Sequence, residues 1–287
     1  MRRLLSFLFI AAVLTALSSC RKEILFTEGS SVVEYACHGP FEGKSVKVFY
    51  HVPSGKISSM PVLFVMHGMD RNGDEYRDQW IEQADKYGFI VLVPTFSSEQ
   101  FPDEFYQRGN VTSEDGSYNP ENEGLCPYRR GLQLLYSPQR FQSKIFQHLR
   151  PFRRRPVRSP LPAFQPYASS GQSRCSNAGW YTYPSDTVSY PYGINGSGAD
   201  VKAYYGKKMI ILLGDADTLR TSSLRQTPET DAQGLTRLAR GNAFFSFCQK
   251  DAEAKGNPFN WRKEYVKGVG HSNTKMAPSA ARLLYGE

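Results

Sequence analysis

The chain has 287 residues, which suits one large α/β domain, and no linker-like stretch divides it. Its 35 Lys and Arg against 27 Asp and Glu give a formal net charge of +8. The excess lies in one segment, because ten basic residues and no acidic one fall between Glu123 and Asp186. Without those ten, 25 basic residues stand against 27 acidic ones, so the composition excludes a generally basic surface elsewhere.

The N-terminus predicts export. Two arginines precede the apolar run 4–17, which is shorter than the roughly 20 residues of a membrane-spanning helix. Leu17-Ser-Ser-Cys20 resembles the bacterial lipobox, in which the cysteine is lipidated and begins the mature protein. Arg21 follows where an inner-membrane protein favours aspartate. We therefore expect a lipoprotein signal peptide at 1–19 and a lipid anchor in the bacterial cell envelope, at the outer membrane; a plain signal peptide or a short anchor helix is the alternative.

The first elements expected along the chain form a βαβ unit. Alternating polarity predicts a strand over 44–52, and the apolar runs 61–66 and 89–94 are typical of strands buried on both faces. Helical spacing predicts one helix over 74–87, ended by Gly88. Strand, helix and strand within about thirty residues indicate a parallel pair.

The rest of the chain continues the α/β pattern. The polar stretch 97–124 indicates a long surface excursion, and 177–180 indicates the end of a strand. A buried strand, a helix, a strand and a closing helix follow at 208–213, 235–255, 261–266 and 276–285. The expected fold class is α/β, a mostly parallel sheet flanked by helices. Residues 20–43 are expected to form a tether and first strand region, and 44–287 a single domain.

The cysteines do not make a disulfide framework. Cys126 and Cys175 lie at the two edges of the basic segment, and Cys37 and Cys248 lie outside it. An exported protein can form disulfides. We expect two free core thiols at Cys37 and Cys248, although a bond between them stays open.

Three predicted strand ends carry residues suited to catalysis. His67-Gly68-Met69 follows the first buried strand, Gly214-Asp-Ala-Asp217 the third, and Gly270-His271-Ser272 the last. The carboxyl ends of parallel strands meet at one edge of a sheet, where catalytic groups collect. An acid followed by a histidine, each at a strand end, has the order found in the triad of a hydrolase.

In their order and spacing, Met66-His-Gly-Met-Asp-Arg-Asn-Gly73, the Gly214–Asp217 loop and Gly270-His271 resemble the esterase and polyhydroxyalkanoate-depolymerase branch of the α/β-hydrolases. The resemblance covers residues 44–124 and 176–287. It implies Asp217 as the triad acid, with Asp215 as the fallback, His271 as the base, and amides of Gly68 and Met69 as oxyanion donors. It implies no cofactor and no metal.

Structural roles are the alternatives for each of these side chains. His67 is interpreted as a structural or oxyanion-loop histidine rather than a base. Asp215 and Asp217 could cap the turn that follows, and His271 could be a solvated loop histidine. The placement of acid and histidine at strand ends favours the triad.

The nucleophile that such a triad requires is missing. No G-x-S-x-G sequence occurs anywhere in the chain. Ser170 and Ser197 lack both the spacing and a preceding buried strand. In such hydrolases the serine lies on a sharp strand-to-helix turn, the nucleophile elbow. At the position expected for this elbow the sequence is Arg150-Pro-Phe-Arg-Arg-Arg-Pro-Val, inside the basic segment.

A reading-frame shift explains this gap. Most arginine codons are CGN, so reading from their second base starts each codon with G, and the eight residues from Arg150 can decode as G-H-S-A-G-G-Q-F. The same shift restores an amphipathic helix over 128–135. We therefore interpret residues 126–175 as a compensated double frameshift; a genuine Arg/Pro-rich loop that binds a polyanion is the alternative. The prolines and arginines predict irregular structure at 126–175, and a poorly stable, inactive protein.

The parent protein is interpreted as an exported serine hydrolase that cleaves a carboxylic ester. Its substrate could be a small ester, a polyester or an esterified polysaccharide. The aromatic loop 180–192 could contact a flat or sugar-bearing ligand, or could pack as lid and core. The rival function is a non-catalytic, lipid-anchored binding protein on a hydrolase fold. Nucleic-acid binding through the arginines ranks last, because an exported protein seldom meets nucleic acid.

Overall fold

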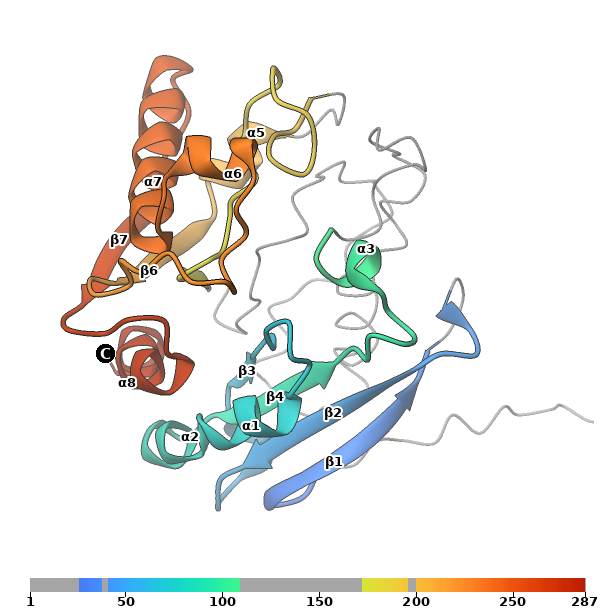
Figure 1. The fold of residues 1–287 in the computed structure, drawn as a ribbon. Coiled ribbons are helices and arrows are strands. Elements are labelled where there is room, and N and C mark those ends of the chain that lie inside the picture. The colour runs from blue at the N-terminus through green and yellow to red at the C-terminus, as the bar shows by residue number, and fades with distance from the viewer. Residues whose placement is uncertain (1–25, 38–40, 109–171, 196–199, 287) are drawn as a thin grey trace, which may run out of the picture.

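The computed structural model describes residues 26–37, 41–108, 172–195 and 200–286. Two sheets form the framework, flanked by helices (Figure 1). The first sheet has the order β1-β2-β4-β3, with β1 (Gly29–Ala36) and β2 (Ser45–Val52) antiparallel. Strand β2 also pairs antiparallel with β4 (Ile90–Thr95). The fold class is α/β, as the sequence predicts.

Strands β3 (Val62–Phe64) and β4 form the expected parallel pair, in which Val62 lies opposite Ile90. The chain between them contains two helices, α1 (Gly73–Asp78) and α2 (Ile81–Tyr87), so the prediction of one continuous helix is wrong. The amide of Trp80 bonds to the Arg77 carbonyl, which tightens the last turn of α1 and places the buried indole in the core. Gly88 ends α2 in the left-handed conformation, as expected.

The second sheet is parallel throughout, in the order β5-β6-β7. Its strands are β5 (Gln172–Ser176), β6 (Lys208–Gly214) and β7 (Trp261–Val266). Four helices accompany it: α5 (Val201–Tyr205), α6 (Pro228–Gln233), α7 (Arg237–Ala254) and α8 (Asn273–Tyr285). The strands and helices predicted after residue 200 are confirmed.

Strand β5 corrects two expectations about the basic segment. The segment was expected to be irregular as far as residue 175, but residues 172–175 pair in parallel with β6. The strand end expected at 177–180 therefore lies at Ser176. The predictions for 126–171, including the frameshifted elbow, concern residues outside those that the structure describes, as do those for the signal peptide and Cys20.

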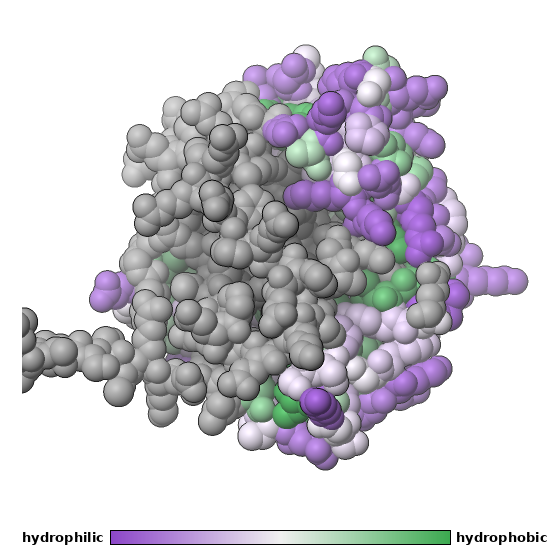
Figure 2. Space-filling model, turned by 180° about the vertical axis from the view of Figure 1, so that it is seen from behind, coloured by the Kyte–Doolittle hydropathy of each residue, from purple (hydrophilic) through white to green (hydrophobic). Residues whose placement is uncertain are grey.

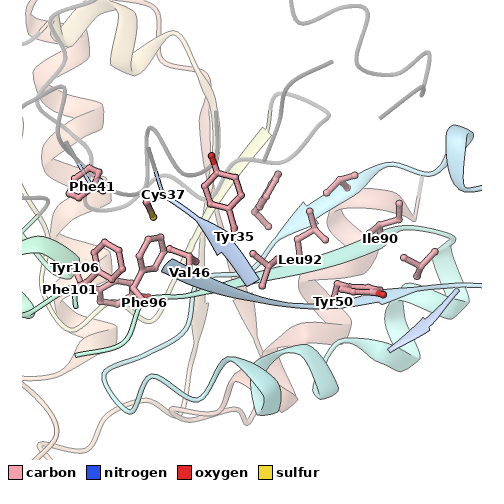
Figure 3. Packing of buried hydrophobic residues seen from close by; sticks show 14 of the residues in the cluster. Tyr35, Cys37, Phe41, Val46, Tyr50, Ile90, Leu92, Phe96, Phe101 and Tyr106 are labelled. Atoms are coloured by element: carbon pink, nitrogen blue, oxygen red, sulfur yellow. The ribbon is translucent and has the colours of Figure 1, made fainter. Parts of the chain in front are cut away.

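Strand β4 is buried on both faces, which explains its unbroken apolar sequence. Ile90 and Leu92 face a core with β1, β2 and the segment 96–106 (Figure 3). In that core Phe101 and Tyr106, the latter from α3 (Asp103–Tyr106), are buried. The stretch 97–124, expected to be a surface excursion, is exposed at 97–99 but returns to the core at Phe101 and Tyr106.

The opposite face of β4 belongs to a core that joins the two sheets. Val91 and Val93 pack there with Ile210 and Leu212 of β6, and helix α8 contributes a row of small and apolar residues, Met276, Ala277, Ala280 and Ala281. Helix α8 lies between the second sheet and α2 (Figure 1). This helix therefore holds the two halves of the domain together.

A third core lies on the other side of β6, against α7. The aromatic loop 180–192 contributes to it: Tyr181 stacks on Phe244 at 4.5 Å between ring centroids, and Tyr183 contacts Phe244 edge-on. The contacts of these two rings support the interpretation that the loop packs into the core, rather than the alternative that it contacts a ligand.

Cys248 lies in this third core, whereas Cys37 lies in the core beneath β1, and both thiols are free, as expected. Burial raises the pKa of each thiol.

No helix in the described ranges is both long and apolar enough to cross a bilayer. In the coloured part of the face shown in Figure 2, hydrophilic side chains cover much of the edge, with hydrophobic patches between them.

Candidate active site

The loop after β6 carries two carboxylates. One is buried inside the protein, and the other binds the neighbouring loop, which follows β7. Gly214 ends β6 where a Cβ would overlap the carbonyl oxygen of Val269, so the two loops can meet closely only at a glycine. Asp215 accepts a hydrogen bond of 2.6 Å from the amide of Gly268. This contact gives Asp215 a capping role in the loop after β7. Asp217, two residues further on, is buried.

His271 lies against Asp217 as the sequence predicts. Its Nδ1 is 3.2 Å from Oδ2 of Asp217, and the imidazole is 54% exposed while the carboxylate is 2% exposed. A buried carboxylate at this distance accepts the Nδ1 proton and so fixes the tautomer. Among the described residues Nε2 makes no hydrogen bond, so it can receive a proton from a group that approaches the exposed edge of the ring.

Arg237 is the site residue that the sequence analysis missed. Its Nη1 lies 4.0 Å from Oδ1 of Asp217, and its side chain is as deeply buried as that carboxylate. Nη2 donates to Oγ of Ser223 at 3.2 Å, and the next amide along α7, that of Leu238, donates to the Asp217 carbonyl. Burial lowers the pKa of Arg237, and the charge of Asp217 opposes this shift.

A signal for Arg237 exists in the sequence. Thr236 is the N-cap of α7, so Arg237 occupies the first position of the helix. A cation is unfavourable there because the N-terminus of a helix carries partial positive charge. A nearby anion compensates, and Asp217 is that anion.

His67 has a structural role, as interpreted. Its Nδ1 donates to the Gly68 carbonyl at 2.7 Å and its Nε2 accepts the amide of Phe96 at 3.0 Å, so both ring nitrogens are occupied. The ring stacks on Tyr106 with centroids 4.3 Å apart. Burial lowers the pKa of His67 to about 4, so the ring is neutral near pH 7.

The loop fixed by His67 presents the two residues expected to bind an oxyanion. A Cβ on Gly68 would lie 2.9 Å from Oη of Tyr76, so this ring packs directly on the loop. Burial raises the pKa of Tyr76, and a hydrogen bond with the Gly68 backbone opposes that shift. Met69, by contrast, is 65% exposed. Met69 is thus more accessible than Gly68, which is half-buried.

The strand-end loops are connected through α8, which begins two residues after His271. Asn273, its first residue, donates to Oε1 of Gln79 at 2.5 Å. Because Gln79 belongs to the βαβ unit that also carries His67, this bond links the two halves of the site region. The two serines weighed as nucleophiles, Ser170 and Ser197, lie outside the described residues.

A serine–histidine–carboxylate contact occurs on the first sheet, away from His271 and Asp217. Ser30 Oγ lies 2.8 Å from Nδ1 of His51, and Nε2 of His51 lies 2.7 Å from Asp85. Ser30 and His51 are direct partners in the β1–β2 register, and both nitrogens of the buried ring are occupied. The arrangement satisfies a buried polar residue between sheet and helix α2. Elsewhere in the described ranges, no three His, Cys, Asp or Glu side chains cluster as a metal site would require.

Comparison with solved structures defines the family. The chain is 31% identical to poly(aspartic acid) hydrolase-1 from Sphingomonas sp. KT-1, over 91% of this chain and 100% of that one, with a TM-score of 0.75. It is 26% identical to LpqC, a poly(3-hydroxybutyrate) depolymerase from Bordetella parapertussis, over 91% of each chain, with a TM-score of 0.77. The chain belongs to the α/β-hydrolases, in their esterase and depolymerase branch. No protein-family model matches the chain, and no curated protein does.

Proposed function

We propose that this chain derives from an exported serine hydrolase that cleaves carboxylic esters, and that it is inactive as it stands. The observation that carries the proposal is the contact of 3.2 Å between the half-exposed imidazole of His271 and the buried carboxylate of Asp217. In this mechanism Asp217 orients His271 and stabilises its protonated form, and His271 takes the proton of a serine and returns it to the leaving group. The Met69 amide stabilises the oxyanion, since Gly68 is engaged by Tyr76.

Inactivity follows from the sequence between β4 and β5. The serine elbow belongs there, and no G-x-S-x-G occurs in the chain. The topology supports a lost strand: among the described strands, β3 pairs with β4 alone and β5 with β6 alone. A parallel strand between β3 and β5 would join the two sheets into one. The frameshifted reading supplies a strand, elbow and helix in that interval.

The substrate proposed is a polymer with ester linkages. By name, one solved relative hydrolyses poly(aspartic acid) and another depolymerises poly(3-hydroxybutyrate). The open edge of His271 is compatible with a long chain crossing the site. A small ester and an esterified polysaccharide remain as other substrates for the same chemistry.

Restoring the reading frame tests the proposal. We expect no hydrolysis of p-nitrophenyl butyrate by the chain as it stands, and hydrolysis once one inserted and one deleted base restore G-H-S-A-G-G. In the restored enzyme, His271→Ala and Asp217→Asn should each lower kcat by roughly 10³- to 10⁴-fold. Asp186→Asn, at an exposed site, is the matched control.

Three outcomes would contradict parts of the proposal. Activity that survives His271→Ala removes the triad assignment. A gene in which no such pair of base changes restores the elbow removes the frameshift. A restored, folded chain without hydrolysis favours the rival function, a binding protein, which calorimetry with oligomers of 3-hydroxybutyrate would test.

The lipid anchor is a separate proposal that rests on Leu17-Ser-Ser-Cys20. We expect the protein in the outer-membrane fraction of a Gram-negative host and Cys20→Ser in the soluble periplasmic fraction. Equal fractionation of the two would contradict the anchor.

A further inference from the structure

Asn177 occupies an unusual position directly after β5. It is 5% exposed, and its backbone has a φ of +43°, in the left-handed region. Asparagine tolerates this region better than most residues with a side chain. Strand β5 ends opposite Leu212 of β6, so Asn177 lies at the same sheet edge as the two loops of the candidate site.

The side chain of Asn177 contacts both of these loops. Its Oδ1 accepts a hydrogen bond of 2.9 Å from the amide of Gly214, at the end of β6. Its Nδ2 donates to the carbonyl of Gly270, in the loop after β7, at 3.3 Å. A carboxamide provides an acceptor and a donor on two separate atoms, so one short side chain can bond to two loops at once.

These contacts end next to the two site residues. Gly270 immediately precedes His271, and Gly214 lies three residues before Asp217. The loops already touch through backbone bonds, since the amide of Ala216 donates to the Val269 carbonyl. The Asn177 amide adds a third point of attachment that belongs to neither loop.

We propose that Asn177 is a positioning residue that holds the loop of His271 against the loop of Asp217, so that the imidazole keeps its Nδ1–H tautomer. The importance of this contact for catalysis rests on the proposed function. The tautomer of His271, however, can be measured in a chain that has no activity. Because Asn177 follows β5 in sequence, it also ties the geometry of the acid and base to that strand.

The chain provides a matched control at the opposite ends of the same two strands. Asn260 precedes β7, and its Nδ2 donates to the carbonyl of Gly206, just before β6, at 2.7 Å. Replacing Asn260 removes the same kind of bond between the same strands, away from the site. A purely structural role would give the two replacements the same consequence.

The first experiment reads His271 by NMR in the full chain labelled with ¹⁵N-histidine. Five histidines keep the spectrum simple, and His271→Gln assigns the signal. We expect the unchanged chain and Asn260→Gly to show the Nδ1–H tautomer and a downfield proton bonded to Asp217. Asn177→Gly should lose that proton and show mixed tautomers, although glycine accepts the left-handed φ without strain.

A second variant separates the hydrogen bond accepted by Oδ1 from the one donated by Nδ2. Asn177→Asp keeps the acceptor for Gly214 but cannot donate to Gly270, so it should also weaken the downfield signal. The proposal is overturned if the folded Asn177→Gly keeps the signal, or if Asn260→Gly loses it equally. It is also overturned if neither Asn177 variant folds, because the role of Asn177 is then structural alone.

Kinetics in the frame-restored enzyme complete the test. There Asn177→Gly should lower kcat by about 10- to 100-fold with little change in KM, because an ill-positioned base affects the chemical step more than binding. If the restored enzyme shows no hydrolysis while the NMR result holds, the proposed function fails and the positioning role stands. If hydrolysis is normal in Asn177→Gly, the positioning role fails alone.

Discussion

Asp217 lies between an arginine and a histidine, and its burial makes both contacts necessary. A carboxylate that is 2% exposed loses most of its hydration, so it needs compensation from within the protein. Arg237 supplies a buried positive charge at 4.0 Å from Oδ1, and His271 supplies a hydrogen bond to Oδ2. Each oxygen of Asp217 thus has its own partner.

Replacing Arg237 should expose this dependence. We expect Arg237→Met to lower the free energy of unfolding by about 2–3 kcal/mol, because a buried carboxylate then lacks its charge partner. Urea denaturation at pH 7 measures the loss, with Arg262→Met on the exposed side of β7 as the control. The double variant Arg237→Met with Asp217→Asn should lose less than the sum of the two single changes; strict additivity would contradict the pairing.

His67 predicts a pH dependence of stability. The unfolded chain binds a proton at the usual histidine pKa of 6.5, whereas burial lowers the pKa of the folded chain to about 4. The unfolded state therefore binds more protons in this window, so stability is lost as the pH falls from 6.5 to 4. The loss should reach about 3 kcal/mol. Urea titrations across this pH range measure the free energy of unfolding. For His67→Gln this free energy should fall with pH by that much less than for the unchanged protein, and an equal slope for the two would contradict the prediction.

At the scale of elements, α8 does more than close the chain. It begins two residues after His271 and packs small residues against both sheets, so the loop that holds the imidazole is anchored by a helix in the joint core. The fully buried Ala277 and Ala281 allow this close approach. Small residues at these positions are a packing requirement.

Enlarging one of them tests the packing. We expect Ala281→Leu to destabilise the protein by about 1–3 kcal/mol, because the filled core must shift to accept the added methyl groups. Lys275→Leu adds leucine on the exposed face of the same helix and should change stability by less than about 0.5 kcal/mol. Equal unfolding midpoints for the two variants in urea would contradict the assignment of the buried face.

At the scale of the whole molecule, the described strands form two sheets that share one core rather than one continuous sheet. An unpaired parallel edge presents N–H and C=O groups that favour association with other chains. The interval 96–171 between β4 and β5 is where a hydrolase of this family places its elbow strand and helix. The proposed frameshift would therefore affect stability as well as chemistry.

Repair of the frame should stabilise the molecule. We expect the restored chain to melt about 10 °C higher than the present one, because a central strand and its helix add several kcal/mol of packing. Differential scanning calorimetry gives the midpoint, and light scattering during heating should show less aggregation for the restored chain. An equal or lower midpoint would mean that the present segment packs as well as the proposed original.

The sequence alone predicted the α/β class and most strands and helices, and it indicated that an acid and a histidine lie at neighbouring strand ends. These features are local: an apolar run sets a buried strand, and a polar residue after it lies at the sheet edge. The same logic predicts a missing elbow, since the chain contains no G-x-S-x-G sequence. Local patterns failed where packing in the folded protein mattered. The sequence predicted one helix over 74–87, but the structure has two helices, with the buried Trp80 between them.

Only the tertiary structure decided which side chains support the pair. The sequence resemblance favoured Asp217 over Asp215, and in the folded chain Asp215 accepts the amide of Gly268 whereas Asp217 contacts His271. Arg237 and Asn177 are distant in sequence from both loops, so although a cation at the start of α7 indicates a nearby anion, no spacing identifies Asp217 or Gly270 as the partner. Their roles depend on distances and burial across the sheet edge, which a linear pattern does not contain.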